Sequence, residues 1–247
     1  GAGSFFSTAA QLPVPIDHVT DQLELSARYN GGRWYASAAY QASLFRNGIE
    51  ALTWANPFTP VVARATQGQL ALAPDNQFHQ VSASGGIEIS PTIRATADVA
   101  FGRLTQDEPY LAATLNSSLG TITPPMAGLD GKVDTFNGSV RVTITPIDKL
   151  RINASYARDV RDNRTATASY TAVATDLFVG GSFTNTPFSF RQDRFKLHAD
   201  YRGPWGLRFA AGIEEDMINR SYQEVSDTRE TTVWGKVSGR PMKALRF

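Results

Sequence analysis

The feature that most constrains this chain is a repeated alternation of apolar and polar residues. The first clear case runs over residues 21–30, turns at Gly31 and Gly32, and returns over residues 33–45. In both stretches every second side chain is apolar or small, and most of the others are polar. A period of two indicates β-strands, because successive side chains of a strand point to opposite faces of the sheet. The chain is therefore expected to be all-β.

The connections between these stretches alternate between very short and very long. Short turns are expected at 31–32, 90–91, 146–148, 203–206 and 240–241. Long connections lie at 46–77, 104–132 and 161–190. Compact soluble domains rarely contain several loops longer than about 12–15 residues, whereas bacterial outer-membrane barrels combine short periplasmic turns with long extracellular loops. The pattern therefore predicts an antiparallel transmembrane β-barrel whose long connections are extracellular.

The alternation predicts nine full strands and the start of a tenth. Their expected ranges are 20–30, 33–45, 78–89, 92–103, 133–145, 149–160, 191–202, 207–218, 231–238 and 242–247. Residues 1–19 are expected to be loop-like, because Pro13 and Pro15 cannot join a regular strand ladder. Because 242–247 is too short to cross a bilayer, we interpret residues 1–247 as part of a larger outer-membrane barrel. The alternative is that Phe247 is a true terminus, since bacterial barrels often end in phenylalanine.

Composition narrows the remaining classes of protein. No apolar run approaches the roughly eighteen residues of a transmembrane helix. The absence of cysteine excludes disulfides, thiolate metal sites and covalently attached haem on this chain. The net charge of +1 gives no support for a basic nucleic-acid-binding face. Nucleic acid is therefore not an expected partner, whereas outer-membrane lipid is.

The second face of the predicted strands is unusually charged, and this separates two interpretations. A soluble β-sandwich with one apolar face is the simpler one, but it does not explain so many charges of both signs on the other face. A membrane barrel explains both faces, since lipid covers one and a polar lumen lies behind the other. The residues expected to face the lumen and contact a partner there are Arg28, Arg94, Asp98, Arg141, Arg151, Arg194, Lys196, His198, Asp200 and Arg208. Arg103 and Arg202 are assigned to the same face.

Aromatic residues near strand ends on the apolar face are expected to form girdles at the membrane interfaces. They are Tyr29, Trp34, Tyr40, Phe101, Tyr156 and Tyr201. Since tyrosine and phenylalanine also favour ordinary strands, this pattern supports the membrane interpretation without deciding it.

No group of residues has the spacing of a catalytic or metal site. The histidines, His18, His79 and His198, lie in separate segments, and the chain has no C-x-x-C-H motif for haem. The acidic residues at 214–216 do not match a calcium-binding loop. No G-x-S-x-G motif is present for a hydrolase nucleophile. We therefore expect no enzymatic activity, and no cofactor or metal bound by this chain itself.

Several segments of the chain resemble one known family. They are residues 12–17 (LPVPID) followed by 20–23 (TDQL), residues 72–79 (LAPDNQFH) and residues 102–108 (GRLTQDE). The first two precede predicted strands and the third ends one. In these segments, and in strand rhythm and loop positions through most of its length, the chain resembles the MtrB/PioB family of decahaem-associated outer-membrane proteins.

The resemblance implies a function as well as a fold. It implies a large barrel that holds a periplasmic decahaem c-type cytochrome in its lumen, with an extracellular multihaem cytochrome as a further partner. Electrons would cross the outer membrane along haem c groups that belong to the cytochrome. This chain lacks the C-x-x-C that some family members carry. A general diffusion porin or outer-membrane transporter would have a similar polar wall, so it stands as the alternative function.

Overall fold

The computed structural model describes residues 2–5, 8–56, 62, 64–174 and 176–239, and their regular structure is nearly all β-strand. The largest sheet has nine antiparallel strands in the order β15-β14-β13-β10-β9-β8-β7-β4-β3. Their bounds are β3 (His18–Asn30), β4 (Trp34–Asn47), β7 (Asn76–Ser90), β8 (Ile93–Gln106), β9 (Gly131–Ile147), β10 (Leu150–Asn163), β13 (Phe190–Arg202), β14 (Leu207–Arg220) and β15 (Asp227–Gly239). The predicted antiparallel all-β fold is confirmed, and within the described residues the sheet does not close on itself.

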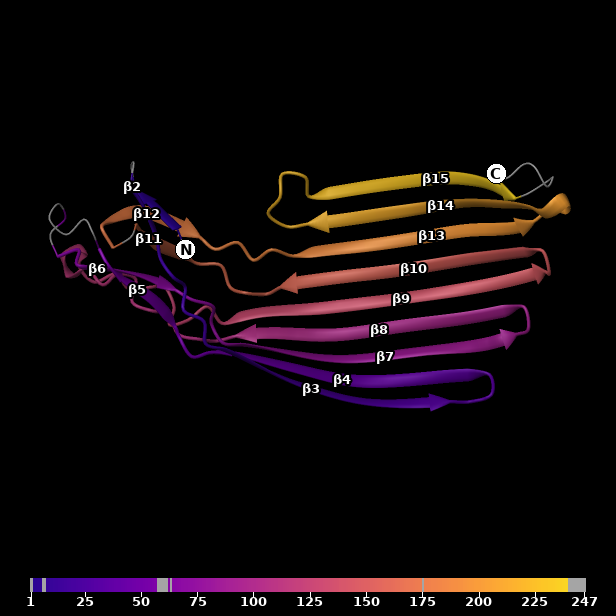
Figure 1. Ribbon diagram of the computed structural model, residues 1–247, viewed down its shortest axis with the longest axis horizontal. Helices are drawn as coiled ribbons and strands as arrows, with labels where there is room; N and C mark the ends of the chain where they lie inside the picture. Colours follow the sequence, from indigo (N-terminus) through magenta and orange to yellow (C-terminus); the bar gives the residue numbers. More distant parts are fainter. Residues whose placement is uncertain (1, 6–7, 57–61, 63, 175, 240–247) are drawn as a thin grey trace.

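The two ends of this sheet differ, as Figure 1 shows. Short turns join the strands at one end, on the right of the view, and the long connections gather at the other end. The strands are 13–17 residues long, whereas about 9–11 residues suffice to cross a bilayer. Several of these strands extend past their predicted ends, as β9 does at both ends. The expected strand at 242–247 and turn at 240–241 lie outside the described residues.

The long connections and the N-terminal segment contain more structure than the sequence indicated. The strands found there are β1 (Ala2–Phe5), β2 (Thr8–Gln11), β5 (Ala51–Ala55), β6 (Gln67–Ala71), β11 (Ser169–Ala174) and β12 (Phe178–Thr184), in three two-stranded sheets. The prediction that residues 1–19 are loop-like was therefore wrong for β1, β2 and the start of β3, whereas residues 12–17, which contain both prolines, have no regular structure. Strands of four to seven residues are too short for their alternation to stand out beside proline, glycine and asparagine. Two short 3₁₀ turns, η1 (Ser117–Leu119) and η2 (Pro204–Gly206), complete the described elements.

Within the described residues, protein covers neither face of the nine-stranded sheet. On the apolar side Leu25, Val81 and Phe101 expose 59%, 57% and 59% of their surface. Exposed apolar surface in water costs roughly 25 cal/mol per Å² relative to burial, so this side needs an apolar covering. Several of the few buried apolar side chains, such as Leu52 and Leu177, lie in the long connections instead.

Asp176 joins the three long connections to one another. Its buried carboxylate accepts hydrogen bonds from the Thr114 hydroxyl and the Leu115 N–H, both at 2.6 Å. A third bond comes from the Gln69 N–H at 2.9 Å. The side-chain amide of Asn116, which is also buried, donates to the Asp176 carbonyl at 2.9 Å. The long connections therefore form one linked unit at their end of the sheet.

Candidate functional site: the two faces of the sheet

The strand register divides the side chains of the sheet between two faces. Partners in register on neighbouring strands share a face, and one such row crosses all nine strands. It consists of Arg28, Ser37, Ser84, Asp98, Ser139, Ala157, Arg194, Asp216 and Glu230. All ten residues predicted to face the lumen lie on the side of this row, which we call the polar face. The structure thus brings them onto one surface, and their contact with a partner stays a prediction.

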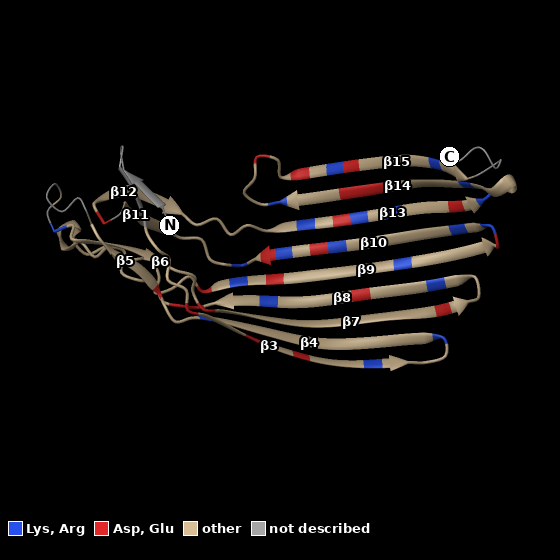
Figure 2. Cartoon of the chain, in the orientation of Figure 1, with Lys and Arg blue, Asp and Glu red and all other residues tan. Residues whose placement is uncertain are grey.

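Charges on the polar face are matched in places by charges on neighbouring strands. Lys196 and Glu214 stand in register, with Nζ and Oε2 2.6 Å apart. The Arg94 guanidinium lies 3.3 Å from the Glu88 carboxylate. Exposed pairs of this kind contribute only about 0.2–1 kcal/mol each. Figure 2 shows charges of both signs along β10, β13, β14 and β15, whereas β4 and β7 carry few.

The opposite side, which we call the apolar face, carries a band of aliphatic and aromatic side chains. At the short-turn end the rings of Tyr29 and Trp34 lie 4.5 Å apart, and those of Tyr201 and Phe209 lie 6.5 Å apart. Nearer the long connections the band includes Phe101, which exposes 59% of its surface. Aromatic residues toward both limits of an apolar band are typical of the interfacial girdles of outer-membrane barrels.

Arg103 lies on the apolar face, so its assignment to the polar face was wrong. It follows Phe101 by two residues, and alternation therefore places both side chains on the same side. Its register partner is Asp134, and the guanidinium donates to both carboxylate oxygens at 2.6 and 3.1 Å. The wrong assignment overlooked the odd separation between Asp98 and Arg103, which puts these two on opposite faces.

Arg103 belongs to a series of ion pairs that limits the apolar band toward the long connections. The pairs are Asp21–Arg46, Arg103–Asp134, Arg158–Asp193 and Glu215–Arg229. We call this series the charged boundary. The sequence alone does not reveal the charged boundary, because the two partners of each pair lie on different strands and only the register shows which charges meet. Charged side chains on the lipid side cost about 0–1 kcal/mol near the interface, against about 2–4 kcal/mol at the midplane.

The charged boundary does not follow one row of register partners. Glu215 on β14 shares a row with Tyr29 on β3 through the intervening strands. On β3 itself the boundary residue is Asp21, about eight residues closer to the long connections. The limit of the apolar band therefore runs diagonally across the sheet.

The described residues form neither a metal site nor a membrane-spanning helix. No group of three or more histidine and acidic side chains in this part of the chain is placed to hold a metal ion. His79 Nδ1 lies 2.8 Å from the Tyr40 hydroxyl, and His198 Nε2 lies 3.0 Å from the Asn153 amide nitrogen. Both imidazoles thus already have protein partners. Among the described helices, none is long and apolar enough to span a membrane.

Comparison with known sequences identifies relatives of the chain. The family model for outer membrane β-barrel porins of the MtrB/PioB type matches residues 1–247. Outer membrane protein MtrB of Shewanella baltica (strain OS185) is 33% identical over 235 residues, which cover 95% of this chain and 33% of that protein. The chain thus spans about a third of the length of this curated relative.

Solved structures that align with the chain are hydrocarbon channels and transporters. The CymD monoaromatic hydrocarbon channel aligns with a TM-score of 0.36 and 14% identity, over 90% of this chain and 65% of that chain. The Pseudomonas putida toluene transporter TodX aligns with a TM-score of 0.35 and 11% identity, over 87% of this chain and 65% of that chain. Similarity at this level carries no argument about function.

Long two-faced strands, an apolar band with aromatic limits, and short turns opposite long connections define the wall of a porin-like outer-membrane β-barrel. The chain belongs to the MtrB/PioB family of such proteins. This confirms both the family resemblance and the predicted location in the bacterial outer membrane. Bacterial barrels place short turns in the periplasm and long loops outside the cell, and we orient the sheet accordingly.

Proposed function

We propose that the polar face forms part of the inner wall of a larger barrel that holds a multihaem c-type cytochrome in its lumen. The barrel encloses the haem chain, positions its ends and separates it from lipid. Electrons cross the outer membrane along the haem groups, which belong to the cytochrome. The barrel itself binds no cofactor and catalyses no reaction.

The observation that carries this proposal is the mixed-sign, hydrogen-bonding polar face of a chain that belongs to this family. A protein enclosed in a lumen needs complementary partners for its own surface charges, which fix its register and exclude wrong partners. Arg28, Arg141 and Arg194 supply positive charge on separate strands, and Asp98 and Asp200 supply negative charge. The family resemblance implies a decahaem cytochrome as the enclosed protein, and the chain belongs to that family.

The linked long connections support a second contact at the outer end. The hydrogen bonds of Asp176 hold them together as one unit, so they offer a connected surface rather than separate loops. An extracellular multihaem cytochrome docks on this unit, where the haem chain ends. Electrons then pass outward to an extracellular acceptor or inward from an extracellular donor such as ferrous iron.

The first test is extraction of the intact protein from its own outer membrane under mild conditions. The preparation should carry haem absorbance, and deletion of its gene should abolish electron exchange with extracellular iron without changing solute permeability. A colourless preparation that conducts ions freely would contradict the sheath and favour a general diffusion porin or transporter.

A second test uses two neighbouring positions on β9. Ser139 lies on the polar face and Val140 on the apolar face, at the same depth. A photo-crosslinking residue at position 139 should form a covalent adduct with the cytochrome, whereas the matched variant at position 140 should not. Equal crosslinking from both positions would show that the polar face is not the contact surface.

A further inference from the structure

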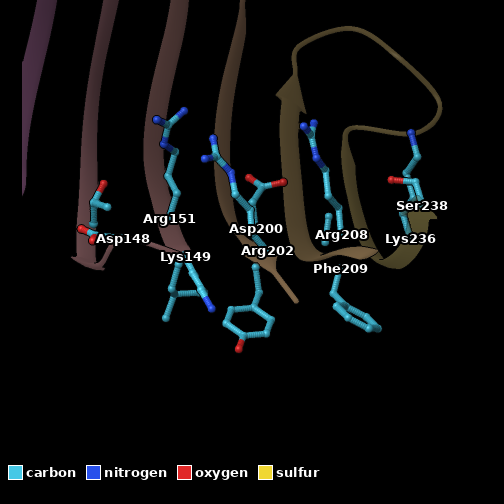
Figure 3. A pocket seen from close by; sticks show the side chains of 13 residues that line it. Asp148, Lys149, Arg151, Asp200, Arg202, Arg208, Phe209, Lys236 and Ser238 are labelled. Atoms are coloured by element: carbon cyan, nitrogen blue, oxygen red, sulfur yellow. The ribbon is translucent and has the colours of Figure 1, made fainter. Parts of the chain in front are cut away.

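Four cations gather on the polar face close to the short turns. Arg151, Arg202, Arg208 and Lys236 lie on β10, β13, β14 and β15 and line a hollow of about 380 Å³. Figure 3 shows Arg151, Arg208 and Lys236 pointing to one side of the sheet and Phe209 pointing to the other. The hollow as a whole is lined by five cations and two carboxylates, so positive charge is in excess.

Among the described residues these four cations lack ion-pair partners, as Arg28, Arg141 and Arg194 on the same face also do, but these four lie together around one hollow. Lys196 and Arg94 each have a carboxylate within 4.0 Å. In the part of the chain that the structure describes, no such pair involves Arg151, Arg202, Arg208 or Lys236. Asp200, which stands in register with Arg151, and Asp148 offset two of the five positive charges, so the remaining excess is available to a group from outside the sheet.

Arg202 and Arg208 also oppose each other directly across β13 and β14. Like charges in register on neighbouring strands repel and destabilise the sheet. An external anion between them would remove this repulsion. The arrangement therefore makes a binding surface that gains from added negative charge.

The spread of the cations indicates the kind of anion that fits. Two strands, β13 and β14, separate β10 from β15. With about 4.8 Å between neighbouring strands, the cations span roughly 14 Å. A single phosphate or carboxylate group is too small to contact all four. Several carboxylates spread over the surface of a folded protein match this distance.

We propose that this hollow docks an acidic patch of the protein that occupies the lumen, at the periplasmic mouth through which that protein enters. The inference rests on the proposed sheath function and adds where the partner is held and by which charges. Opposite charges at the mouth also steer the encounter, and salt screens this attraction.

The test removes the opposed pair of arginines in the intact protein and compares two variants. Arg202→Gln with Arg208→Gln removes two of the five cations of the hollow, whereas Arg46→Gln with Arg229→Gln removes two cations from the charged boundary on the apolar face. The readout is the NaCl concentration that releases the cytochrome, followed by its haem absorbance, from the immobilised barrel. The hollow variant should bind the cytochrome roughly tenfold more weakly at low salt and release it at lower NaCl. The control should match the unmodified protein.

The outcomes separate this inference from the sheath function. A hollow variant with the unmodified salt profile overturns the inference and leaves the sheath function standing. An unmodified barrel without haem overturns both. If the double variant does not fold, judged by heat-modifiable migration, Lys236→Gln is read in the same way.

Discussion

Ala97 and Asp98 are neighbours on β8 whose side chains point to opposite faces of the sheet. Ala97→Arg puts a charge into the apolar band, and we expect it to lower the free energy of unfolding by about 2–4 kcal/mol. Asp98→Arg puts the same charge on the polar face, where we expect a loss below about 1 kcal/mol. Urea unfolding of the barrel in lipid vesicles measures both. Equal losses would contradict the assignment of the two faces.

Asp176 has a backbone φ of 59°, a left-handed conformation that aspartate and asparagine tolerate better than most residues. Asp176→Ala leaves the Thr114 hydroxyl and two backbone N–H groups without their acceptor, and each such buried donor costs roughly 1–3 kcal/mol. We expect faster protease cleavage in the long connections with unchanged β-sheet circular dichroism. Asp176→Asn keeps one oxygen and the backbone preference, so it should be cleaved more slowly than the alanine variant. Unchanged cleavage of the alanine variant would show that Asp176 does not link the connections.

Single residues show where sequence reasoning succeeds and where it stops. The ten polar-face residues could be placed because alternation alone decides the side of a strand, and a correct count would also have placed Arg103. The role of Asp176 could not be predicted. Its donors Leu115 and Gln69 lie 61 and 107 residues away in sequence, and no local pattern connects them.

The long strands could be predicted because their alternation continues over 13–17 residues. The hairpins in the long connections could not, because a five-residue strand such as β5 offers only two or three alternations. Pairing of these hairpins depends on contacts between connections more than on their own residues. One such contact joins Tyr110 to Tyr170 on β11, with the hydroxyl oxygens 2.8 Å apart.

This tyrosine contact makes the linked connections sensitive to alkaline pH. Burial, and then the hydrogen bond to Tyr170, raise the pKa of Tyr110 above its usual 10.0. The folded state therefore holds this proton more tightly than the unfolded state. The contribution of this contact to the free energy of unfolding is full below pH 10 and declines as the pH rises further. Tyrosinate absorbance should show one tyrosine titrating late, and Tyr110→Phe should remove it. Titration of Tyr110 at its usual pH would contradict this.

For the whole molecule, the open sheet raises the question of its edges. Within the described residues, β3 and β15 each have a neighbour on one side only. Backbone groups inside a bilayer must all be paired, which only closed barrels and helices achieve. The larger barrel that we propose supplies those neighbours. Alternation along the strands does not report the total number of strands in a barrel. The proposal of a larger barrel therefore depends on the family match and on the curated relative, of which this chain covers 33%.

The diagonal course of the charged boundary gives the tilt of the strands relative to the membrane normal. If the boundary is level with the membrane surface, register must shift by about eight residues between β3 and β14. That is roughly 27 Å along the strands for roughly 34 Å across them. The strands then lean about 40° from the membrane normal, within the 35–45° of known outer-membrane barrels. Polarised infrared spectroscopy of oriented membranes measures this lean directly, and strands standing upright would mean that the ion pairs sit at different depths.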